Sequence, residues 1–500
     1  MSRISKAAIV AAAIVAAMAM PARADSSTSV TVNSSSNSND RFTSTFTKSL
    51  TFRGGKVSIE HRFGNITLRT HGGNGVEVHA TIRASSAEIG RAITVSATES
   101  ASGISIVTTY PETKHWSSVN GETSYSVDYD IDMPANAPLV VRNRFGNLDV
   151  SGLRAHGDIN NAMGHVNFRD STGAQEIENS FGSVDVSNSA GDTIIRNQNG
   201  SVKAGHVQGN LEISDRFASV SVVDAERNVI ITNANGSVDL RDVSGSATVK
   251  NSFASVTVHD VRGGLELNNN NGSVDVSNIG GKTSIRNSFA TVSVTNTPDL
   301  TVIAQNGRVN ATAIRGPVNI TTSFATVEVR DIAGFAKVHN ENGNVTAVDI
   351  RGALDVDTRF GSVRAEHVKG RADVDNSNGN VSLTDVDGSA RVHTSFGSAF
   401  LKDIAGSIDV DNQNGAIVVD DLARGHCHDV TLKTTFSSIK VGVPEGGYNV
   451  SARTSFGHIS SAFPITTSNA SSESIVGTIN GGGCKLDLAN SNGNITIEKD

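Results

Sequence analysis

The segment NSFASVTVHDVRGGLELNNNNG, residues 251–272, holds one full copy of a pattern that fills most of this 500-residue chain. Residues 256–259 alternate apolar and polar side chains, which is the periodicity of a β-strand with one buried face. Residues 260–263, Asp-Val-Arg-Gly, break the alternation and are typical of a turn. Alternation resumes at residues 265–268, and Asn271 followed by glycine opens the next copy. One copy is therefore predicted to contain two short strands and two tight corners.

The pattern recurs every 18 residues, with a single 17-residue step. We take Phe253 as the anchor of its copy; each anchor is followed by glycine or alanine. A short, fixed period is the sequence signature of a repeat architecture. The anchors are Phe145, Met163, Phe181, Asn199, Phe217, Asn235, Phe253, Asn271, Phe289, Asn306, Phe324, Asn342, Phe360, Asn378, Phe396 and Asn414.

Stacking of the copies follows from their size. Two short strands cannot bury their own valines, because isolated strand pairs are only marginally stable in water. Laying each copy on the one before pairs the backbone groups and builds a continuous core. We therefore predict an all-β fold, a single elongated parallel β-helix or β-solenoid of 18-residue, two-strand units. We expect its valines and phenylalanines to share one interior.

The anchors alternate between Phe and Asn-Gly, so the larger chemical repeat is 36 residues, or two copies of the pattern. Two geometries fit this alternation. If one coil holds a single copy, Phe and Asn alternate along one corner, and each ring fills space beside a small Asn-Gly layer. If one coil holds two copies, Phe stacks on Phe along one edge and Asn on Asn along another. We favour the shorter coil, because the strand, turn and Asn positions all recur at the shorter period.

A second asparagine recurs two positions before the anchor, where Thr322, Thr358 and Thr394 replace it in other copies. Asparagines stacked at the strand spacing can hydrogen-bond up and down a ladder. Asparagine also favours turns in general, which explains less well why a single position keeps it. We predict a structural ladder formed by Asn143, Asn161, Asn179, Asn197, Asn233, Asn251, Asn269, Asn287, Asn340, Asn376 and Asn412.

An aspartate recurs at one turn position. The simplest role for it is to cap the turn through a side-chain oxygen. A carboxylate row that binds Ca²⁺ is the alternative, but the Gly-Gly-x-Gly-x-Asp calcium pattern is absent. We predict no catalytic residue, no cofactor and no metal site. The turn aspartates are Asp242, Asp260, Asp331, Asp349, Asp385 and Asp403.

Residues 1–24 have the pattern of an export signal. Arg3 and Lys6 precede an apolar run at residues 7–20, and residues 22–24, Ala-Arg-Ala, suit cleavage after Ala24. The run is shorter than the roughly 20 residues that span a bilayer, so the mature chain is predicted to lack a membrane span. We expect an exported protein, located in the periplasm or outside the cell at its surface.

The remaining chain divides by regularity. Residues 25–40 are rich in serine and asparagine and are predicted to be a disordered leader. Residues 41–140 are predicted to form an irregular N-terminal β cap, and residues 141–422 the regular solenoid. Residues 423–500 are predicted to form a C-terminal stretch of solenoid or cap, because the ends of a solenoid must cover its open core.

Cys427 and Cys484 are the only cysteines, and export would place them in an oxidising compartment. A disulfide between them is possible, but the sequence does not fix whether their Cα atoms come within the ~4.4–6.8 Å that a bridge needs. His426 and His428 flank Cys427 and are residue types that bind metals. A surface loop beside a disulfide is the simpler interpretation of this short cluster.

Several stretches resemble the DUF4097 family of bacterial β-strand repeat proteins, which carries an adhesin label. They include residues 127–134, VDYDIDMP, residues 139–147, LVVRNRFGN, and the ending at residues 490–497, NSNGNITI. The resemblance covers nearly all of the chain after the signal. It implies a solenoid on or outside the cell envelope and supplies no catalytic residues.

Three functions are weighed on these grounds. The first is a non-catalytic structural or adhesive rod of the cell envelope, which would bind a cell-surface glycan or an envelope protein through many weak contacts. The second is a polysaccharide-active enzyme, which would need a cleft where several charged residues outside the repeat converge. The third is a periplasmic scaffold or sensor that binds an envelope protein through Trp116 and the nearby tyrosines, although these are expected to pack within the cap.

Nucleic acid is not an expected partner. Removal of the signal takes Arg3, Lys6 and Arg23 from 42 basic residues and leaves 39 against 50 acidic ones, a net charge of −11. Nothing basic is clustered and aromatic residues are few, whereas nucleic-acid binding needs a basic patch. The sequence predicts no oligomeric state.

Overall fold

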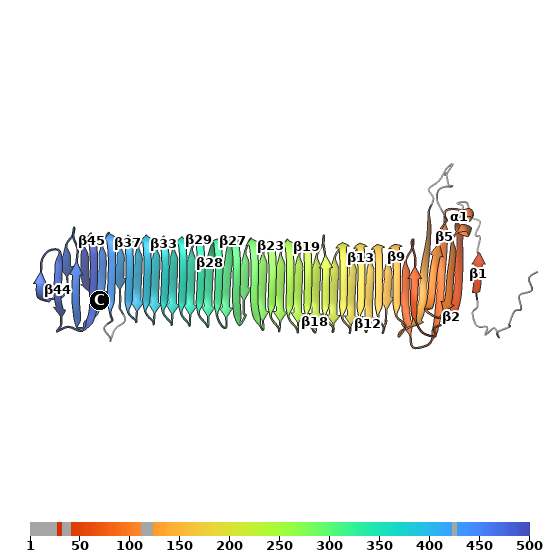
Figure 1. Ribbon diagram of the computed structural model, residues 1–500, viewed down its shortest axis with the longest axis horizontal. Helices are drawn as coiled ribbons and strands as arrows, with labels where there is room; N and C mark the ends of the chain where they lie inside the picture. The colour runs from red at the N-terminus through yellow and green to blue at the C-terminus, as the bar shows by residue number, and fades with distance from the viewer. Residues whose placement is uncertain (1–27, 33–41, 112–123, 423–427) are drawn as a thin grey trace, which may run out of the picture.

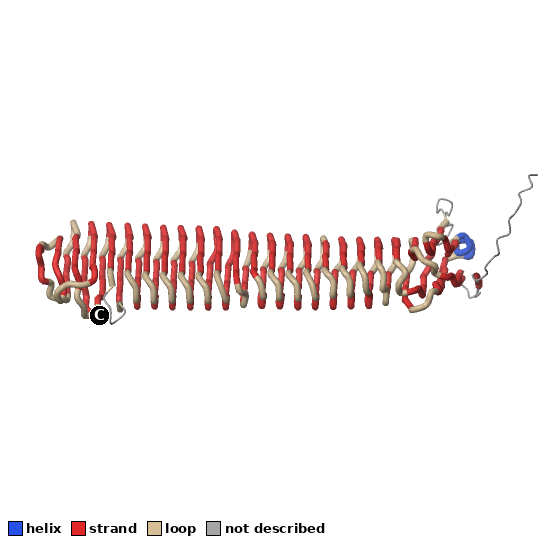
Figure 2. The backbone as a smooth tube through the Cα atoms, turned by 60° about the horizontal axis from the view of Figure 1, so that its bottom comes forward, coloured by secondary structure: helices blue, strands red, loops and turns tan. Residues whose placement is uncertain are grey.

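The computed structural model describes residues 28–32, 42–111, 124–422 and 428–500. These residues form one long rod of stacked strands, with a single short helix, α1 (Ala87–Ala92), near the N-terminal end (Figure 1). Figure 2 shows the strands following one another coil by coil along the rod axis. The predicted solenoid is confirmed. The predicted signal at residues 1–24 lies outside the described residues.

One coil consists of two strands, as β21 (Ala247–Phe253) and β22 (Val256–Val261) illustrate. β21 pairs in parallel with β23 (Leu265–Asn271), and β22 pairs in parallel with β24 (Val274–Ile279). Asn251 lies opposite Asn269 in the first pair, so the register advances by one copy of the pattern from coil to coil. At the one short coil it advances by one residue less, with Ile285 opposite Val302. One coil therefore holds a single copy, and the geometry with two copies per coil is excluded.

The two strands of each coil belong to two parallel sheets that face each other. The first sheet contains β9 (Leu139–Phe145), β11 (Gly157–Met163), β13 (Gln175–Phe181), β15 (Thr193–Asn199), β17 (Leu211–Asp215), β19 (Val229–Asn235), β21, β23, β25 (Lys282–Phe289), β29 (Ala336–Asn342), β31 (Leu354–Phe360), β33 (Ala372–Asn378), β35 (Ala390–Phe396), β37 (Ile408–Asn414) and β39 (Val430–Phe436). The second contains β10 (Leu148–Ser151), β12 (Val166–Ser171), β14 (Val184–Ser189), β16 (Val202–Val207), β18 (Val220–Ala225), β20 (Val238–Val243), β22, β24, β26 (Val292–Thr295), β30 (Val345–Ile350), β32 (Val363–Val368), β34 (Val381–Val386), β36 (Ala399–Ile404), β38 (Ile417–Asp420) and β40 (Ile439–Val443). Two longer strands, β27 (Asp299–Ile314) and β28 (Val318–Ile332), continue through the corner and serve both sheets.

The core fills the space between the two sheets. Val256 and Val258 point inward from one sheet, and Leu265 and Leu267 point inward from the other, all of them buried. Each fully buried side chain of this kind stabilises the fold by roughly 1.5–3 kcal/mol. The same positions repeat in every coil, so the core is continuous along the rod.

The turn aspartates are explained by backbone conformation. Asp242 and Asp260 have φ angles of 55° and 59°, in the left-handed region, and from Asp170 to Asp421 the equivalent residue of every coil lies between 49° and 62°. Aspartate and asparagine enter this region more readily than other residues with a side chain. Their side chains bond along the rod, since Asn188 Nδ2 donates to Asp170 Oδ1 at 2.9 Å. The recurring aspartate is therefore better explained by its tolerance of the left-handed backbone conformation than by capping of the turn.

The recurring asparagine two positions before each anchor occupies what we call the asparagine slot. It is buried inside the corner opposite the turn aspartates. Asn179 Nδ2 donates to the carbonyl of Gly182 at 2.9 Å and to that of Gly164, in the preceding coil, at 3.2 Å. Direct bonds between side chains at this position are few: Asn143 donates to Asn161 at 3.0 Å, Asn161 donates to Asn179 at 3.3 Å, and Thr322 donates to Asn340 at 2.6 Å. The amide-to-amide ladder is therefore only part of the bonding. Two bonds to carbonyl groups of the corner are also made by Asn197, Asn233, Asn269, Asn340 and Asn376.

The N-terminal end closes with antiparallel strands. The first coil, β3 (Lys56–Glu60) and β4 (Ile66–His71), pairs with β9 and β10. Its other edge is covered by β7 (Gly103–Thr109) and β8 (Tyr125–Pro134). Antiparallel strands then extend both sheets. These strands are β6 (Thr94–Ser100) beside β7, and β5 (Gly75–Ala84), β2 (Phe42–Thr51) and β1 (Thr28–Val32) beyond β8.

The predicted leader needs one correction. Residues 28–32 form β1 and pair with β2, so residues 25–40 are not disordered throughout. Their sequence, Thr-Ser-Val-Thr-Val, consists mainly of β-branched residues, which favour strands.

The C-terminal end is out of sequence order. β39 and β40 pair with the last two strands of the chain, β45 (Cys484–Asn492) and β46 (Ile495–Lys499). β41 (Tyr448–Arg453) and β42 (Ile459–Ser461) lie beyond them. β44 (Ser474–Ile479) and β43 (Thr466–Ala470) continue this end in antiparallel pairing. The last two strands of the chain thus form a coil between β39 and β40 on one side and β41 and β42 on the other, although β41 and β42 precede them in the sequence.

Within the described ranges, no helix combines the length and the apolar character needed to cross a bilayer.

Candidate functional site

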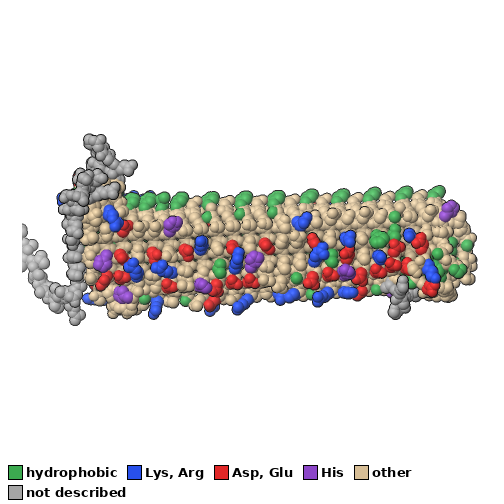
Figure 3. Space-filling model, turned by 180° about the vertical axis from the view of Figure 1, so that it is seen from behind, with side chains coloured by type: hydrophobic (Ala, Val, Ile, Leu, Met, Phe, Trp, Pro, Cys, Tyr) green, Lys and Arg blue, Asp and Glu red, His purple; other side chains and the backbone are tan. Residues whose placement is uncertain are grey.

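A row of exposed phenylalanines runs along one edge of the rod. The anchor residue of each coil projects from the corner between the two sheets, and in every second coil this residue is Phe. Figure 3 shows apolar side chains spaced along this edge over most of the molecule. The row, in which each side chain is between 49% and 58% exposed, consists of Phe181, Phe217, Phe253, Phe289, Phe324, Phe360, Phe396 and Phe436.

The expectation that these rings share the interior was wrong. Strand alternation stops at the corner, and Ser252, Phe253, Ala254 and Ser255 all lie on the outer side or only partly inside. The neighbouring coils place Asn271 at the same position. An asparagine without partners is costly in an apolar core, so a position shared by Phe and Asn has to face solvent. The alternation itself was the signal for this placement.

The residue after the anchor is glycine because consecutive corners nearly touch. A Cβ built on Gly182 would lie 2.1 Å from the carbonyl oxygen of Gly164, and its φ is 122°. Alanine replaces glycine in four coils: Ala254 and Ala290 have left-handed φ angles of 86° and 82°, whereas Ala218 and Ala325 do not adopt the left-handed conformation. The close contact holds every anchor on one straight line along the rod.

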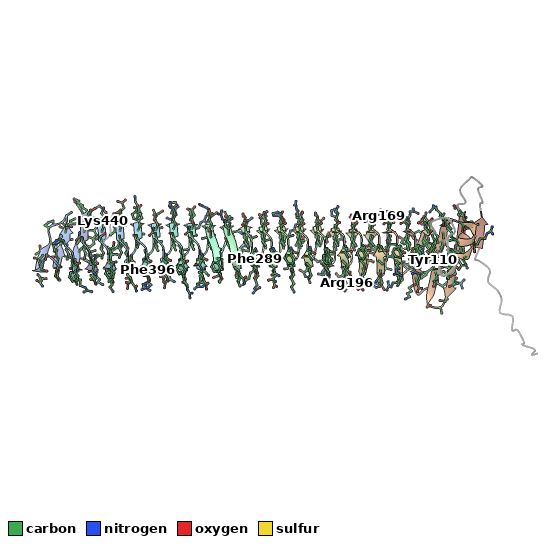
Figure 4. All side chains as sticks on the ribbon, turned by 90° about the horizontal axis from the view of Figure 1, so that it is seen from above. Tyr110, Arg169, Arg196, Phe289, Phe396 and Lys440 are labelled. Atoms are coloured by element: carbon green, nitrogen blue, oxygen red, sulfur yellow. The ribbon has the colours of Figure 1, made fainter. Side chains whose placement is uncertain are left out.

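Rings of the row cannot contact one another. Phe253 and Phe289 both lie opposite Asn271, one coil to either side, so about 9.6 Å separates them at the usual strand spacing of ~4.8 Å. Aromatic pairs need their ring centroids within about 4.5–7 Å. Phe289 and Phe396, labelled in Figure 4, lie well apart along the rod.

The N-terminal end of the same line is different. Phe63 and Phe145 lie in adjacent coils and stack, with centroids 5.1 Å apart and an interplanar angle of 4°. Tyr110 and Tyr125 each meet Phe63 edge-on at 5.2 Å. These rings are therefore covered by the chain itself. The tyrosines that we considered as partner contacts pack in the cap, and Trp116 lies outside the described residues.

A buried polar network lies beneath this aromatic cluster. His61 Nδ1 is 3.2 Å from Thr108 Oγ1, which in turn is 2.5 Å from the hydroxyl of Tyr129. Burial lowers the pKa of His61 to about 4 and raises the pKa of Tyr110 to about 12. Burial also raises the pKa of Tyr129. The network is therefore neutral at pH 7 and contributes to the packing of the cap.

The surroundings of the row carry little charge. The residues directly before the anchor and two positions after it are mostly serine, threonine, asparagine and glutamine. Charged residues lie instead on the flat faces, where they form pairs such as Arg196 with Glu176 and Arg169 with Asp149 (Figures 3 and 4). Between Phe181 and Phe436 the exceptions beside the row are Arg216, Arg308, Glu341 and Arg359.

A shallow groove of about 760 Å³ follows the opposite corner of the rod, where the turn residues have left-handed backbone conformations; we call it the left-handed corner. Asp224, Asp242 and Asp260 line it from consecutive coils, together with His206 and Arg315. His206 Nδ1 lies 2.5 Å from the carboxylate of Asp224. The three carboxylates occupy one repeated position, so the groove follows from the coil geometry. No grouping of three or more His, Cys, Asp or Glu side chains within the described ranges has the arrangement of a metal site.

The cysteine region is only partly described. Cys484 begins β45 opposite Tyr448 and packs against the core. Cys427 and His426 lie outside the described residues, so the pairing of the two cysteines stays a prediction.

Comparison with known proteins gives a family match and a structural neighbour. Residues 278–498 match the family described as Toastrack DUF4097, which confirms the resemblance over that part of the chain. A solved structure described as a "putative cell adhesion protein" from Clostridium sporogenes is similar at 13% identity, covering 41% of this chain and 98% of its own, with a TM-score of 0.17. None of the curated proteins matches the chain.

Proposed function

We propose that the chain is an exported, non-catalytic β-solenoid that serves as a structural or binding rod of the bacterial cell envelope, with the phenylalanine row as its binding surface. The row itself carries this proposal. Eight half-exposed rings stand in one line on a mostly polar surface. Soluble proteins rarely leave apolar groups so arranged in water unless they meet a partner.

The form of the surface favours an extended partner. The same contact recurs at every second coil, and each ring offers only a small area. Many weak contacts of this kind add up to strong binding when they engage together. A cell-surface glycan and an envelope protein both offer such extended surfaces.

The proposed location depends on residues 1–24. Their basic start, apolar run and Ala-Arg-Ala ending have the order of a cleaved secretory signal. The proposal places the rod in the periplasm or on the outside of the cell.

A non-catalytic role is supported by the distribution of charge. General acid-base catalysis needs a proton donor and a proton acceptor held close to one reacting bond. The groove at the left-handed corner presents repeated aspartates in a row, with His206 already paired to Asp224. Many of the remaining charges form exposed pairs on the flat faces, such as Arg142 with Asp158.

The test compares two triple variants in fractionated cells, whole-cell binding and a glycan array. The first variant is Phe324→Asn, Phe360→Asn, Phe396→Asn, which copies the residue of the intervening coils and should leave the fold intact. The matched control, Val223→Thr, Ile230→Thr, Ile303→Thr, removes three apolar side chains that are 42% to 47% exposed away from the row.

We expect the row variant to lose binding at least tenfold and the control to bind as the unchanged chain does. Equal binding by the row variant and the unchanged chain would contradict the proposal. So would turnover of a glycan by the purified chain. Recovery of the protein in the cytoplasm would contradict the proposed location.

A further inference from the structure

We propose that the partner of the phenylalanine row is a second copy of this chain, lying antiparallel beside the first so that the rings of each row enter the gaps of the other. The inference rests on the proposed function, because it takes the row as the binding surface. It goes further by naming the occupant and its orientation.

The spacing of the row provides the first argument. Phe253, Asn271 and Phe289 follow one another in register, so each gap between two rings is one coil wide and holds a smaller side chain. A ring from outside that enters the gap would lie about 4.8 Å along the axis from each neighbour, within the range that aromatic pairs prefer. Phe63 and Phe145 show this geometry within the molecule, stacked at 5.1 Å.

Only a surface with the same period fills every gap. A second rod has large and small side chains alternating at the same distance, because the alternation arises from the same coils. Shifted by one coil, its Phe positions face the Asn positions of the first rod. The two edges are thus complementary in shape along their whole length.

The area is sufficient for a stable pair. A phenylalanine buries roughly 150–250 Å² in full, so a half-exposed ring offers about 100 Å². Eight such rings offer about 800 Å² from each copy, which equals the share of one partner in a protein interface of standard size.

The charge distribution permits close approach. The whole chain carries a net charge of −8, which would drive two copies apart if it were spread evenly. The edge that bears the row is flanked by serine, threonine, asparagine and glutamine, and Glu341 is the one acidic residue beside it between Phe181 and Phe436. Low charge combined with aromatic side chains is the composition of an interface centre.

Symmetry selects the antiparallel arrangement. A twofold axis perpendicular to both rods relates the two edges, makes the same contacts on each copy and closes the assembly as a dimer. In the antiparallel pair, the twofold axis can lie at any height along the rods, so it can be placed where the two rows are offset by one coil. A parallel pair with the same offset has no closed symmetry.

The experiment measures association of the full chain by sedimentation equilibrium, and shape by small-angle X-ray scattering. We expect a dimer in the micromolar range with the length of one rod and twice its cross-section. The variant Phe324→Asn, Phe360→Asn, Phe396→Asn should raise the dissociation constant at least about a hundredfold. The control Val223→Thr, Ile230→Thr, Ile303→Thr should associate as the unchanged chain does, and circular dichroism should show equal strand content in all three.

Each of the remaining outcomes contradicts the proposed dimer, and the binding measurements then decide whether the proposed function stands. A chain that stays monomeric at about 100 μM overturns the inference, as does a row variant that still dimerises normally. If the chain is monomeric and the row variant has lost glycan or cell binding, the row is a binding surface for another partner and the proposed function stands. If the chain is monomeric and the row variant binds normally, both proposals fail. A dimer of doubled length would show end-to-end contact and also overturn the inference.

Discussion

The aromatic anchors have different surroundings in two regions of their line along the rod. At the N-terminal end, Phe63 and Phe145 stack on each other and Phe63 is enclosed by Tyr110 and Tyr125. From Phe181 onward the rings have no aromatic neighbour within the described residues and stand half in solvent. The sequence places the same residue type at the same corner in both regions.

The difference teaches what an anchor phenylalanine contributes to the fold. In the cap, the ring is part of the packing that closes the solenoid, and its loss would open a cavity. In the middle of the rod, the ring contributes little to folding, because asparagine fills the same position in alternate coils. A residue that we expect to be dispensable for the fold and that recurs eight times in line agrees with the proposed contact with a partner.

The largest expected effect tests this contrast directly, by replacing one ring in each region with the residue of the intervening coils. Phe63→Asn should lower the free energy of unfolding of the cap by about 3 kcal/mol, because it removes a packed ring. Phe360→Asn should change the stability by less than about 0.5 kcal/mol, as an exposed substitution does. Urea unfolding followed by tyrosine fluorescence measures the first, and circular dichroism measures the second. Equal costs for the two variants would contradict the distinction.

A second, smaller effect should appear when the pH is lowered. The pKa of His61 falls from its ordinary 6.5 to about 4 in the folded cap, because burial disfavours the charged imidazole. The unfolded chain therefore binds the proton first, and the stability present above pH 6.5 is lost progressively as the pH falls towards 4. At pH 5 this loss should amount to about 2 kcal/mol.

The measurement is amide hydrogen exchange at pH 7 and pH 5, corrected for the intrinsic exchange rates. Strands β7 and β8 of the cap should lose protection at pH 5, whereas β31 in the middle of the rod should not. In the control variant His61→Gln, which does not titrate, the loss between the two pH values should disappear. A pH effect that is unchanged in this variant would assign it to another group.

The coil could be predicted from the sequence, and the reason is physical. Period, strand alternation and the recurring asparagine all depend on one local geometry, which each copy repeats. The error over the phenylalanines came from extending strand alternation through a corner, where Ser252 and Phe253 both turn outward. Asn271 at the equivalent position already indicated a solvent-facing site, since amide groups seldom occupy an apolar core without partners.

The ends could not be predicted in the same way. Their strands pair across long stretches of sequence, and spacing alone does not specify such pairs. One signal was present at the C-terminal end, where Phe436 and Phe456 follow each other without an asparagine anchor between them. The structure places Asn492 between them in space, opposite both, so the Phe/Asn alternation continues although the chain order does not.

The smallest expected effect, about 1 kcal/mol once the raised pKa of Asp215 is discounted for screening by solvent, sharpens the comparison by giving the array a pH response opposite to that of the cap. Asp215 stands in the buried asparagine slot, where burial raises the pKa of its carboxyl to about 6. Its folded form holds the proton more tightly than the unfolded chain, so stability is complete below pH 4 and is lost as the pH rises through 6. Asp215→Asn removes this loss and restores an amide that can donate to the corner carbonyls, as Asn233 does at 3.0 and 3.1 Å. Thermal melts should show the variant more stable than the unchanged chain at pH 8, with the gain vanishing near pH 4. A gain of equal size at both pH values would mean that packing, rather than the buried charge, distinguishes this coil from its neighbours.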